Sequence, residues 1–304
     1  MKTTNHQSLI SNHKSRGAVI LALGSPHYGR MAANAAASIR FTDKATPIHL
    51  VYSGDSLSHL TLAHKALFTS MAECPPEYYT KNGKVNYIKA KTCIYELSPF
   101  KETLMLDADL LWFGSTPVGC LMKELSTVDF TMQCRGVYDY TSGKNEGGYT
   151  HWCNVTEAQK VYKLNNKIYQ LSSELLWFRK TKQTRKLFKM VREVFDHPKI
   201  NTDKFIGDVP DEFAYNIATA KLGMYPRKNK EVFIYWPYLD HQTGGNWSEI
   251  LNNYYGYSMG GNSVQPPALL KYEQMAKAHA NALGLPYHFK LFPKKRWDKA
   301  RATI

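Results

Sequence analysis

The sequence lacks any apolar run long enough to cross a membrane. Its first sixteen residues are polar and lack the apolar core of a signal peptide. These absences argue against a membrane-spanning or secreted protein. We therefore expect a flexible polar tail over residues 1–16 and a soluble protein of the cytoplasm, which would be the host cytoplasm for a phage-encoded chain.

Cysteine is scarce, and no two cysteines are spaced as C-x-x-C. An odd number without such pairs argues against a disulfide framework and against a structural zinc site. His151 and Cys153 lie close together in "HWC", but no second pair of ligands follows at zinc-finger spacing. The five cysteines are Cys74, Cys93, Cys120, Cys134 and Cys153.

Acidic residues are few relative to basic ones: 25 Asp and Glu stand against 39 Lys and Arg, a net charge of +14. Such an excess favours a polyanionic partner such as nucleic acid, or an anionic membrane face. The alternative is a basic surface that aids solubility or serves a small anionic substrate. With 304 residues, 43% of them hydrophobic, the chain is long enough for a large core in one elaborated α/β domain or in two domains.

Apolar runs alternate with helical periods over the first half of the chain. This alternation implies right-handed crossovers and a mostly parallel sheet covered by helices on both faces, with ligands bound beyond the carboxyl ends of the strands. We predict strands over residues 17–25, 46–55, 102–109 and 126–136, and helices over 28–41, 56–72 and 89–100.

The second half is less regular. Residues 137–150 are Gly-rich and polar, which predicts a loop that could act as a lid, and residues 252–267 show no regular period. The C-terminal end is strongly basic and contains aromatic residues. We predict strands over 172–180 and 231–239, and helices over 184–195, 208–223 and 268–284, the second of these entered through Pro210.

Two carboxylates, Asp107 and Asp109, interrupt the apolar run "ETLMLDADLLWFGS". Burying an ionised carboxylate is costly unless a cation or hydrogen-bond donors receive it, and a divalent metal is one such partner. The alternative is that the strand ends at Leu106 and both side chains face water. Because the pair falls at the carboxyl end of a predicted strand, we favour a functional role, although phosphoryl transfer and sugar transfer would use the same ion. The further oxygen ligands of an EF-hand are absent.

The first strand-to-helix turn, "GSPHYG", lacks the G-K-[ST] of a P-loop and is not G-x-G-x-x-G. Dinucleotide and ATP binding are therefore disfavoured. The backbone amides of such a loop and the N-terminus of the next helix can still receive a nucleotide. The candidate nucleotide contacts are Leu23, Gly24, Ser25 and Tyr28.

The strand-loop-helix unit over residues 17–40, the helix from residue 89 and the strand "LMLDADLLWFGS" together resemble glycosyltransferases of the GT-A fold, most closely the glycogenin and galactosyltransferase-like group with its "YLDAD" signature. The resemblance spans residues 18–297. It implies a GT-A sheet with a C-terminal elaboration, a nucleotide-binding half over 17–136 and an acceptor-binding half over 137–304. It further implies Mn²⁺ or Mg²⁺, a nucleotide-sugar donor of which a UDP-sugar is favoured, and retention of the sugar's configuration.

Metal and diphosphate contacts follow from this resemblance by position. Asp107 and Asp109 match the two carboxylates of the signature, with Asp109 as metal ligand and Asp107 as ligand of the metal and the ribose. Lys91 stands where the family has a basic residue, usually Arg. "YHFKLFPKKRW" resembles the late "H-x-x-G-x-K-P-W" segment. It implies His288 as third metal ligand, with His241 as rival, and Lys290 or Lys294 as a diphosphate contact.

The catalytic candidates also come from the resemblance. "PDEFAYN" resembles the "D-Q-D-x-x-N" segment and places Asp211 and Glu212 near the reacting sugar. "SSELLWF" stands where the family has "N-S-G", which makes Ser173 and Glu174 candidates although the Asn and Gly are missing. The plainer alternatives are that Glu212 is a first-turn acid favoured by the helix macrodipole and that His288 is a core histidine.

The acceptor follows from charge. The net charge of +14, the basic residues over 180–192, the aromatic and Asn-rich residues 252–262 and the basic tail suit DNA with a hydroxymethylated pyrimidine, as in phage DNA modification. A bacterial glycosyltransferase that builds surface polysaccharide at an anionic membrane is the competing enzyme. A non-catalytic nucleic-acid-binding protein is the alternative of another class, but it has no need of the Asp107 and Asp109 pair. A nucleotide-sugar pyrophosphorylase would need a Lys- and Arg-bearing signature that "GSPHYGR" lacks.

Overall fold

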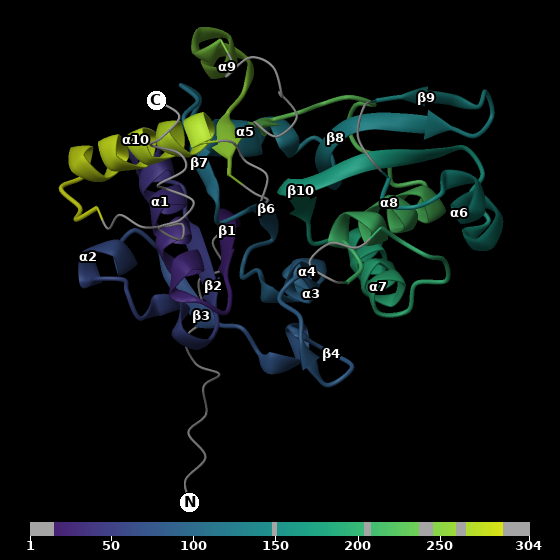
Figure 1. Cartoon of the computed structure of the whole chain (residues 1–304), viewed down its shortest axis with the longest axis horizontal. Coiled ribbons are helices and arrows are strands. Elements are labelled where there is room, and N and C mark those ends of the chain that lie inside the picture. Colours follow the sequence, from purple (N-terminus) through teal and green to yellow (C-terminus); the bar gives the residue numbers. More distant parts are fainter. Residues whose placement is uncertain (1–14, 148–150, 204–207, 237–245, 260–265, 288–304) are drawn as a thin grey trace, which may run out of the picture.

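A computed structural model describes residues 15–147, 151–203, 208–236, 246–259 and 266–287 (Figure 1). Its centre is a seven-stranded sheet in which β1 pairs in parallel with β2 and β6, β2 pairs in parallel with β3, and β10 runs antiparallel to both β6 and β8. The strands in spatial order are β3 (Ser70–Glu73), β2 (Ile48–Tyr52), β1 (Arg16–Ala22), β6 (Glu102–Leu106), β10 (Lys167–Arg179), β8 (Phe130–Asp139) and β9 (Lys144–Glu146).

Both faces of this sheet are covered, as its apolar strands require. In β6, Leu104 and Leu106 belong to one buried cluster and Met105 to the other, because side chains alternate along a strand. Figure 1 shows α10 lying beside α1 on one side of the sheet, and α7 beside α8 on the other. The first cluster contains α1 (Pro26–Thr42), α5 (Val118–Leu125) and α10 (Pro266–Ala282); the second contains α3 (Lys89–Thr92), α4 (Ile94–Leu97), α6 (Val155–Tyr162), α7 (Lys182–Asp196) and α8 (Asp211–Leu222).

Smaller elements complete the fold. A three-stranded sheet in the order β11, β12, β7 extends the first cluster. Within the described residues, no helix is both long enough and apolar enough to span a membrane. The remaining elements are η1 (Gly54–Leu57), α2 (Leu62–Lys65), η2 (Pro76–Tyr78), β4 (Thr80–Lys81), β5 (Lys84–Val85), β7 (Leu110–Trp112), β11 (Ile234–Tyr235), α9 (Trp247–Asn253) and β12 (Gly256–Ser258).

Three predictions from the sequence are wrong. The helix predicted over 56–72 is replaced by η1, α2 and the start of β3; the side chains of β3 are exposed, so only backbone pairing with β2 defines this edge strand. The loop predicted over 137–150 begins with the end of β8 and contains β9, joined by a turn in which Asp139 accepts the N–H groups of Thr141 and Ser142. Residues 252–267, predicted to be irregular, contain the fully buried strand β12.

Most other predicted elements are confirmed with shifted ends. The strands β1, β2, β6, β8 and β10 and the helices α1, α7, α8 and α10 lie where the apolar pattern placed them. The helix predicted over 89–100 is divided into the single turns α3 and α4. Of the strand predicted over 231–239, β11 contains two residues, and residues 237–239 lie outside the described ranges. The predicted α/β sheet with helices on both faces is therefore confirmed.

Candidate functional site

Asp107 and Asp109 lie in the turn that joins β6 to β7, at the carboxyl edge of the parallel strands. The Asp107 N–H donates to the Glu174 carbonyl at 3.1 Å, and the Asp109 carbonyl accepts the N–H of Met259 at 3.0 Å. The Asp107 side chain is only 17% exposed. β6 does end at Leu106, as the alternative has it, but the Asp107 side chain does not simply face water and needs partners inside the protein.

Lys91 is the cation that Asp107 contacts. Its Nζ atom lies 2.8 Å from both carboxylate oxygens of Asp107 and 3.2 Å from the Ser173 hydroxyl. The Tyr215 hydroxyl donates to the Lys91 carbonyl at 2.9 Å and so ties α3 to α8. Burial acts to lower the pKa of Lys91, but the carboxylates of Asp107, Asp211 and Asp109 outweigh it and raise that pKa. Lys91 therefore stays charged.

One lysine does not compensate two carboxylates. Burial raises the pKa of Asp107 to about 7 and that of Asp109 to about 6, although Lys91 acts to lower both. The Oδ1 atom of Asp109 is buried and has no hydrogen-bond partner among the described residues. A divalent cation is one partner that a buried carboxylate oxygen without a donor can take.

The described residues contain no group of three His, Cys, Asp or Glu side chains placed to hold a metal ion. This finding also gives no support to a metal at His151 and Cys153. The predicted third ligand His288, its rival His241 and the predicted diphosphate contacts Lys290 and Lys294 lie outside the described residues. Asp107 and Asp109 thus form the described part of the proposed metal site.

Glu174 reaches the site through a break in the β10–β8 ladder. Ser172 pairs with Gln133, but the next pair is Leu176 with Met132, so β10 bulges between them. Bulges often re-aim a side chain next to an active site. The Glu174 carboxylate accepts from Gln133 Nε2 at 2.7 Å, pairs with Arg135 at 3.4 Å and contacts the Ser172 hydroxyl.

The ionisation of Glu174 follows from these contacts. Burial acts to raise its pKa, but Arg135 and the Ser172 hydroxyl outweigh it and lower the pKa below the usual value. Glu174 is therefore an ionised carboxylate whose oxygens are already hydrogen-bonded. Gln133 is itself fixed, because its Oε1 accepts the N–H groups of Phe233 and Ile234 at 2.9 and 2.6 Å.

Asp211 and Glu212 occupy the first turn of α8, where the helix macrodipole favours negative charge. Glu212 is therefore a first-turn acid, as the plainer alternative has it, and both side chains are also buried, at 4% and 8% exposure. Glu212 accepts the Ser173 N–H at 3.1 Å and the Trp152 indole N–H at 2.6 Å. Burial, Glu174 and Asp211 raise the pKa of Glu212 to about 8. One oxygen of Asp211, Oδ2, has no hydrogen-bond partner among the described residues.

The predicted nucleotide loop begins where β1 ends. Gly24 has φ +89°, and a Cβ atom there would lie 2.5 Å from the Tyr87 ring. Ser25 caps α1 only through its backbone. Tyr28 is 42% exposed. Partial burial raises the pKa of Tyr28, and the nearby Asp109 carboxylate raises it further. The Leu23 side chain is buried in the core, so only its backbone is available to a ligand.

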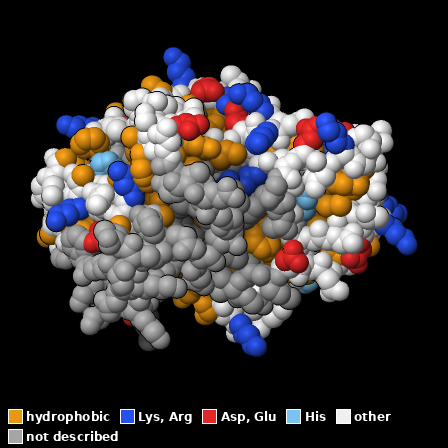
Figure 2. All heavy atoms as spheres, turned by 45° about the horizontal axis from the view of Figure 1, so that its top comes forward, with side chains coloured by type: hydrophobic (Ala, Val, Ile, Leu, Met, Phe, Trp, Pro, Cys, Tyr) orange, Lys and Arg blue, Asp and Glu red, His pale blue; other side chains and the backbone are white. Residues whose placement is uncertain are grey.

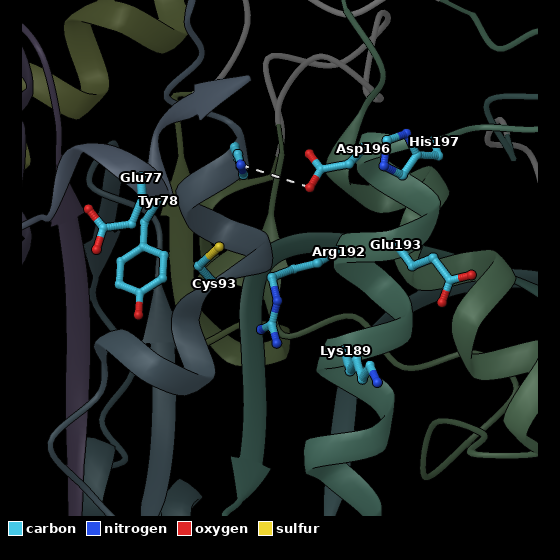
Figure 3. Close-up of a pocket in the computed structure, with 9 residues that line it drawn as sticks. Glu77, Tyr78, Cys93, Lys189, Arg192, Glu193, Asp196 and His197 are labelled. Carbon is cyan, nitrogen blue, oxygen red and sulfur yellow. Dashed lines mark ion pairs between the residues drawn. The ribbon is translucent and has the colours of Figure 1, made fainter. Parts of the chain in front are cut away.

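A separate cavity of about 510 Å³ opens between α3 and α7 (Figure 3). Its walls mix cations and carboxylates, and Lys89 pairs with Asp196 there at 3.8 Å. None of the carboxylates described above lines it. The cavity is therefore distinct from the candidate site.

Sequence reasoning missed several residues of the site. Gln133 and Arg135 hold Glu174, Trp152 holds Glu212 and Tyr215 holds the Lys91 backbone. The polar Gln133 and Arg135 within the apolar strand "FTMQCRGV" were an available signal, because buried polar side chains need partners. Trp152 carried no such signal.

Comparison with solved structures identifies the fold. No protein-family model matches the sequence, and no curated protein matches it either. Among solved structures, the galactosyltransferase LgtC in complex with donor and acceptor sugar analogs is similar: the identity is 14%, the TM-score is 0.53, and the match covers 93% of this chain and 99% of LgtC. An active-site mutant of LgtC matches at 13% identity and a TM-score of 0.50, with the same coverage.

The bifunctional glycosyltransferase WbbM is also similar, at 12% identity and a TM-score of 0.54. The match covers 87% of this chain but only 50% of WbbM, so the chain spans half of that protein. Identities this low relate the folds and not the activities. The α/β sheet and its layers, together with these neighbours, show that the chain has the GT-A glycosyltransferase fold.

Proposed function

We propose that the protein is a metal-dependent glycosyltransferase that moves a sugar from a nucleotide-sugar donor, a UDP-sugar by preference, to a hydroxyl group of an acceptor. The observation that carries this proposal is the buried Asp109 Oδ1 atom without a hydrogen-bond partner among the described residues, beside Asp107 on a GT-A sheet. Transfer would break the bond from the sugar's anomeric carbon to the diphosphate and form one to the acceptor oxygen. The diphosphate would leave with the electron pair of the broken bond and take up the proton of the acceptor hydroxyl.

The residues present fit a divalent cation. Asp107 and Asp109 would hold Mn²⁺ or Mg²⁺, with His288 proposed as a third ligand. A cation is favoured there because Lys91 alone does not offset the negative charge of the two carboxylates, whose pKa values stay raised. When bound, such an ion supplies positive charge to the diphosphate leaving group. The same ion would lower the raised pKa values of both carboxylates.

The chain's own residues have distinct parts in this proposal. Lys91 favours the ionised form of Asp107 and would supply positive charge next to the diphosphate, with Lys290 proposed as a further contact. The backbone of Gly24 and Ser25 with Tyr28 would receive the nucleotide. Asp211, Glu212 and Glu174 would surround the reacting sugar, and the N–H groups of Trp152 and Ser173 hold Glu212 there.

Two acceptors are proposed, each from its own observation. The net charge of +14 supports DNA with a hydroxymethylated pyrimidine. The sugar acceptor analog bound by LgtC supports a saccharide, as in the synthesis of surface polysaccharide. Four basic residues form a stripe along α7: Lys182, Arg185, Lys186 and Lys189. The helix follows Arg179, which pairs with Glu102 across the β10–β6 ladder. Glu102 begins β6, so it lies at the end of that strand away from Asp107.

This placement favours the saccharide. DNA that presents a base to the Asp107 edge would not lie along the start of the stripe, which follows the other end of β6. On the face drawn in Figure 2, the described Lys and Arg side chains are spread out and several lie beside Asp or Glu, so they form no continuous basic track. On this face, the charge that would support DNA is therefore not gathered into one phosphate-binding surface.

The test is a transfer assay with Mn²⁺, a panel of nucleotide sugars, and either hydroxymethylcytosine DNA, hydroxymethyluracil DNA or oligosaccharide acceptors, read by mass spectrometry. One added sugar on an acceptor identifies donor and acceptor together. Asp109→Asn should abolish transfer, while Asp129→Asn, which removes a carboxylate paired with Arg179 at 3.5 Å, should not. Transfer by Asp109→Asn at the wild-type rate would refute the metal site. Absence of both transfer and donor hydrolysis across the panel would refute the enzyme.

A further inference from the structure

Trp152 has a backbone conformation that bulky residues rarely adopt. Its φ is +64°, in the left-handed region, where a non-glycine residue is strained. The surrounding chain holds it there: the Trp152 carbonyl accepts the N–H of Asp203 at 2.9 Å, and Cys153 forms a β-bridge with Thr202. Strain of this kind persists where a particular side-chain placement is needed, so the placement of the Trp152 indole is of interest.

The indole N–H is directed at Glu212. Trp152 Nε1 donates to Glu212 Oε2 at 2.6 Å, while Glu212 Oε1 accepts the backbone N–H of Ser173 at 3.1 Å. The Ser173 N–H is available for this bond because it lies in the β10 bulge and does not pair with β8. The two oxygens of one carboxylate are thus held by two segments far apart in the sequence, which fixes the plane of the carboxylate.

The ionisation of Glu212 depends on these two hydrogen bonds, because other carboxylates lie close to it. Burial raises the pKa of Glu212, as do Glu174 on β10 and Asp211 on α8, whereas the Ser173 and Trp152 N–H groups lower it. Hydrogen bonds from an N–H to a carboxylate are stronger than those between neutral groups. Loss of the indole donor would leave one oxygen of a buried carboxylate without its partner, beside two other carboxylates.

We propose that Trp152 is a positioning residue that fixes the Glu212 carboxylate in the orientation needed at the reacting sugar. The presence of a reacting sugar beside Glu212 rests on the proposed function. The orientation of the carboxylate rests on the hydrogen bonds described above. Trp152 needs no contact with substrate in this role. It acts through Glu212.

The kinetic test uses Trp152→Phe, which keeps an aromatic ring and removes the N–H. We expect kcat to fall roughly tenfold to a hundredfold at neutral pH with the donor KM nearly unchanged. The acidic limb of the pH profile of kcat should move to higher pH, because Glu212 keeps its proton to higher pH without the donor. Trp247→Phe is the matched control: Trp247 is half-buried in α9 and packs against Tyr257 and Lys271.

Three kinetic results would overturn the proposal. An unchanged kcat and pH profile would show that the N–H is not needed. A rise in KM alone would assign Trp152 to substrate binding, and an equal loss in Trp247→Phe would show a general effect of losing an indole.

A second readout needs no substrate. Subtracting the fluorescence of Trp152→Phe from that of the wild type gives the fluorescence of Trp152. Followed from acid to mildly alkaline pH, this signal should change in one step as Glu212 loses its proton. The step should be absent when Glu212→Gln is present in both proteins. If the step is present but no sugar is transferred, the proposed function fails while the Trp152 contact stands. If the step is absent, the positioning proposal fails whatever the activity.

Discussion

The Nζ atom of Lys91 lies 2.8 Å from both oxygens of the Asp107 carboxylate, and this pair joins the two halves of the site. Lys91 belongs to α3, and its backbone carbonyl accepts the hydroxyl of Tyr215 in α8, while Asp107 directly follows β6. The pair therefore links the carboxyl edge of the sheet to the helix that carries Asp211 and Glu212. The charge of Lys91 also acts to lower the pKa of Asp107, against the burial that raises that pKa to about 7.

Replacement of Lys91 by Met should lower the free energy of unfolding by about 3 kcal/mol, because it leaves the Asp107 carboxylate buried without its cation. Urea unfolding measures this loss. Added Mn²⁺ should recover part of it, since the ion would take over the compensation of Asp107. Lys89→Met is the control on the same helix, since Lys89 pairs with Asp196 and not with Asp107. Equal losses in the two variants, or no effect of Mn²⁺, would contradict this account.

Asp109→Asn should make the metal-free protein more stable by about 1 kcal/mol, because it removes a buried charge whose Oδ1 has no donor among the described residues. The same change should remove the stabilisation that Mn²⁺ gives to the wild type. Thermal unfolding in EDTA and in Mn²⁺ measures both effects. A residue that costs stability without its ligand is expected at a functional site. A less stable Asp109→Asn protein in EDTA would show instead that Asp109 is structural.

The parts of the fold that could be predicted from the sequence are those whose signal is local. β1 and β6 are apolar runs bounded by turn residues, and α1 is rich in Ala with Pro26 at its start. Asp107 and Asp109 were predictable because carboxylates stand out within an apolar run. β3 could not be predicted, because its exposed side chains carry no apolar period and its pairing with β2 uses only the backbone.

The contacts that organise the site are not local. Gln133 and Glu174 are 41 residues apart in sequence, and Trp152 and Glu212 are 60 apart. Their meeting depends on the strand order and on the β10 bulge, neither of which leaves a periodic trace in the sequence. The resemblance to the GT-A fold directed attention to Glu174 and Glu212, but it gave no indication of the residues that hold them.

The buried histidines His49 and His151 should make the protein acid-sensitive. Burial lowers the pKa of each to about 4 from 6.5, so the unfolded state binds protons that the folded state does not. Stability from this source is complete above pH 6.5 and is lost as the pH falls towards 4, by roughly 3 kcal/mol for each histidine. The free energy of unfolding measured across this range should fall less steeply in His49→Gln. His197→Gln, at an exposed site, should follow the wild type. An identical slope in His49→Gln would show that His49 is not the source.

Gly24 tests whether the loop after β1 receives the donor. Gly24→Ala places a methyl group at φ +89° and 2.5 Å from the Tyr87 ring, so either the loop or the ring must shift. We expect a loss of stability of about 2 kcal/mol and roughly a tenfold rise in the donor KM, because the backbone amides that would bind the nucleotide move with the loop. Gly143→Ala is the matched control: its φ is +69° with nothing within 4 Å of the added atom, in the turn between β8 and β9. The control should lose stability through its backbone alone and leave KM unchanged. If the two variants change stability and KM alike, the Gly24 loop has no special part in binding the donor, and the nucleotide must be sought elsewhere on the carboxyl edge of the sheet.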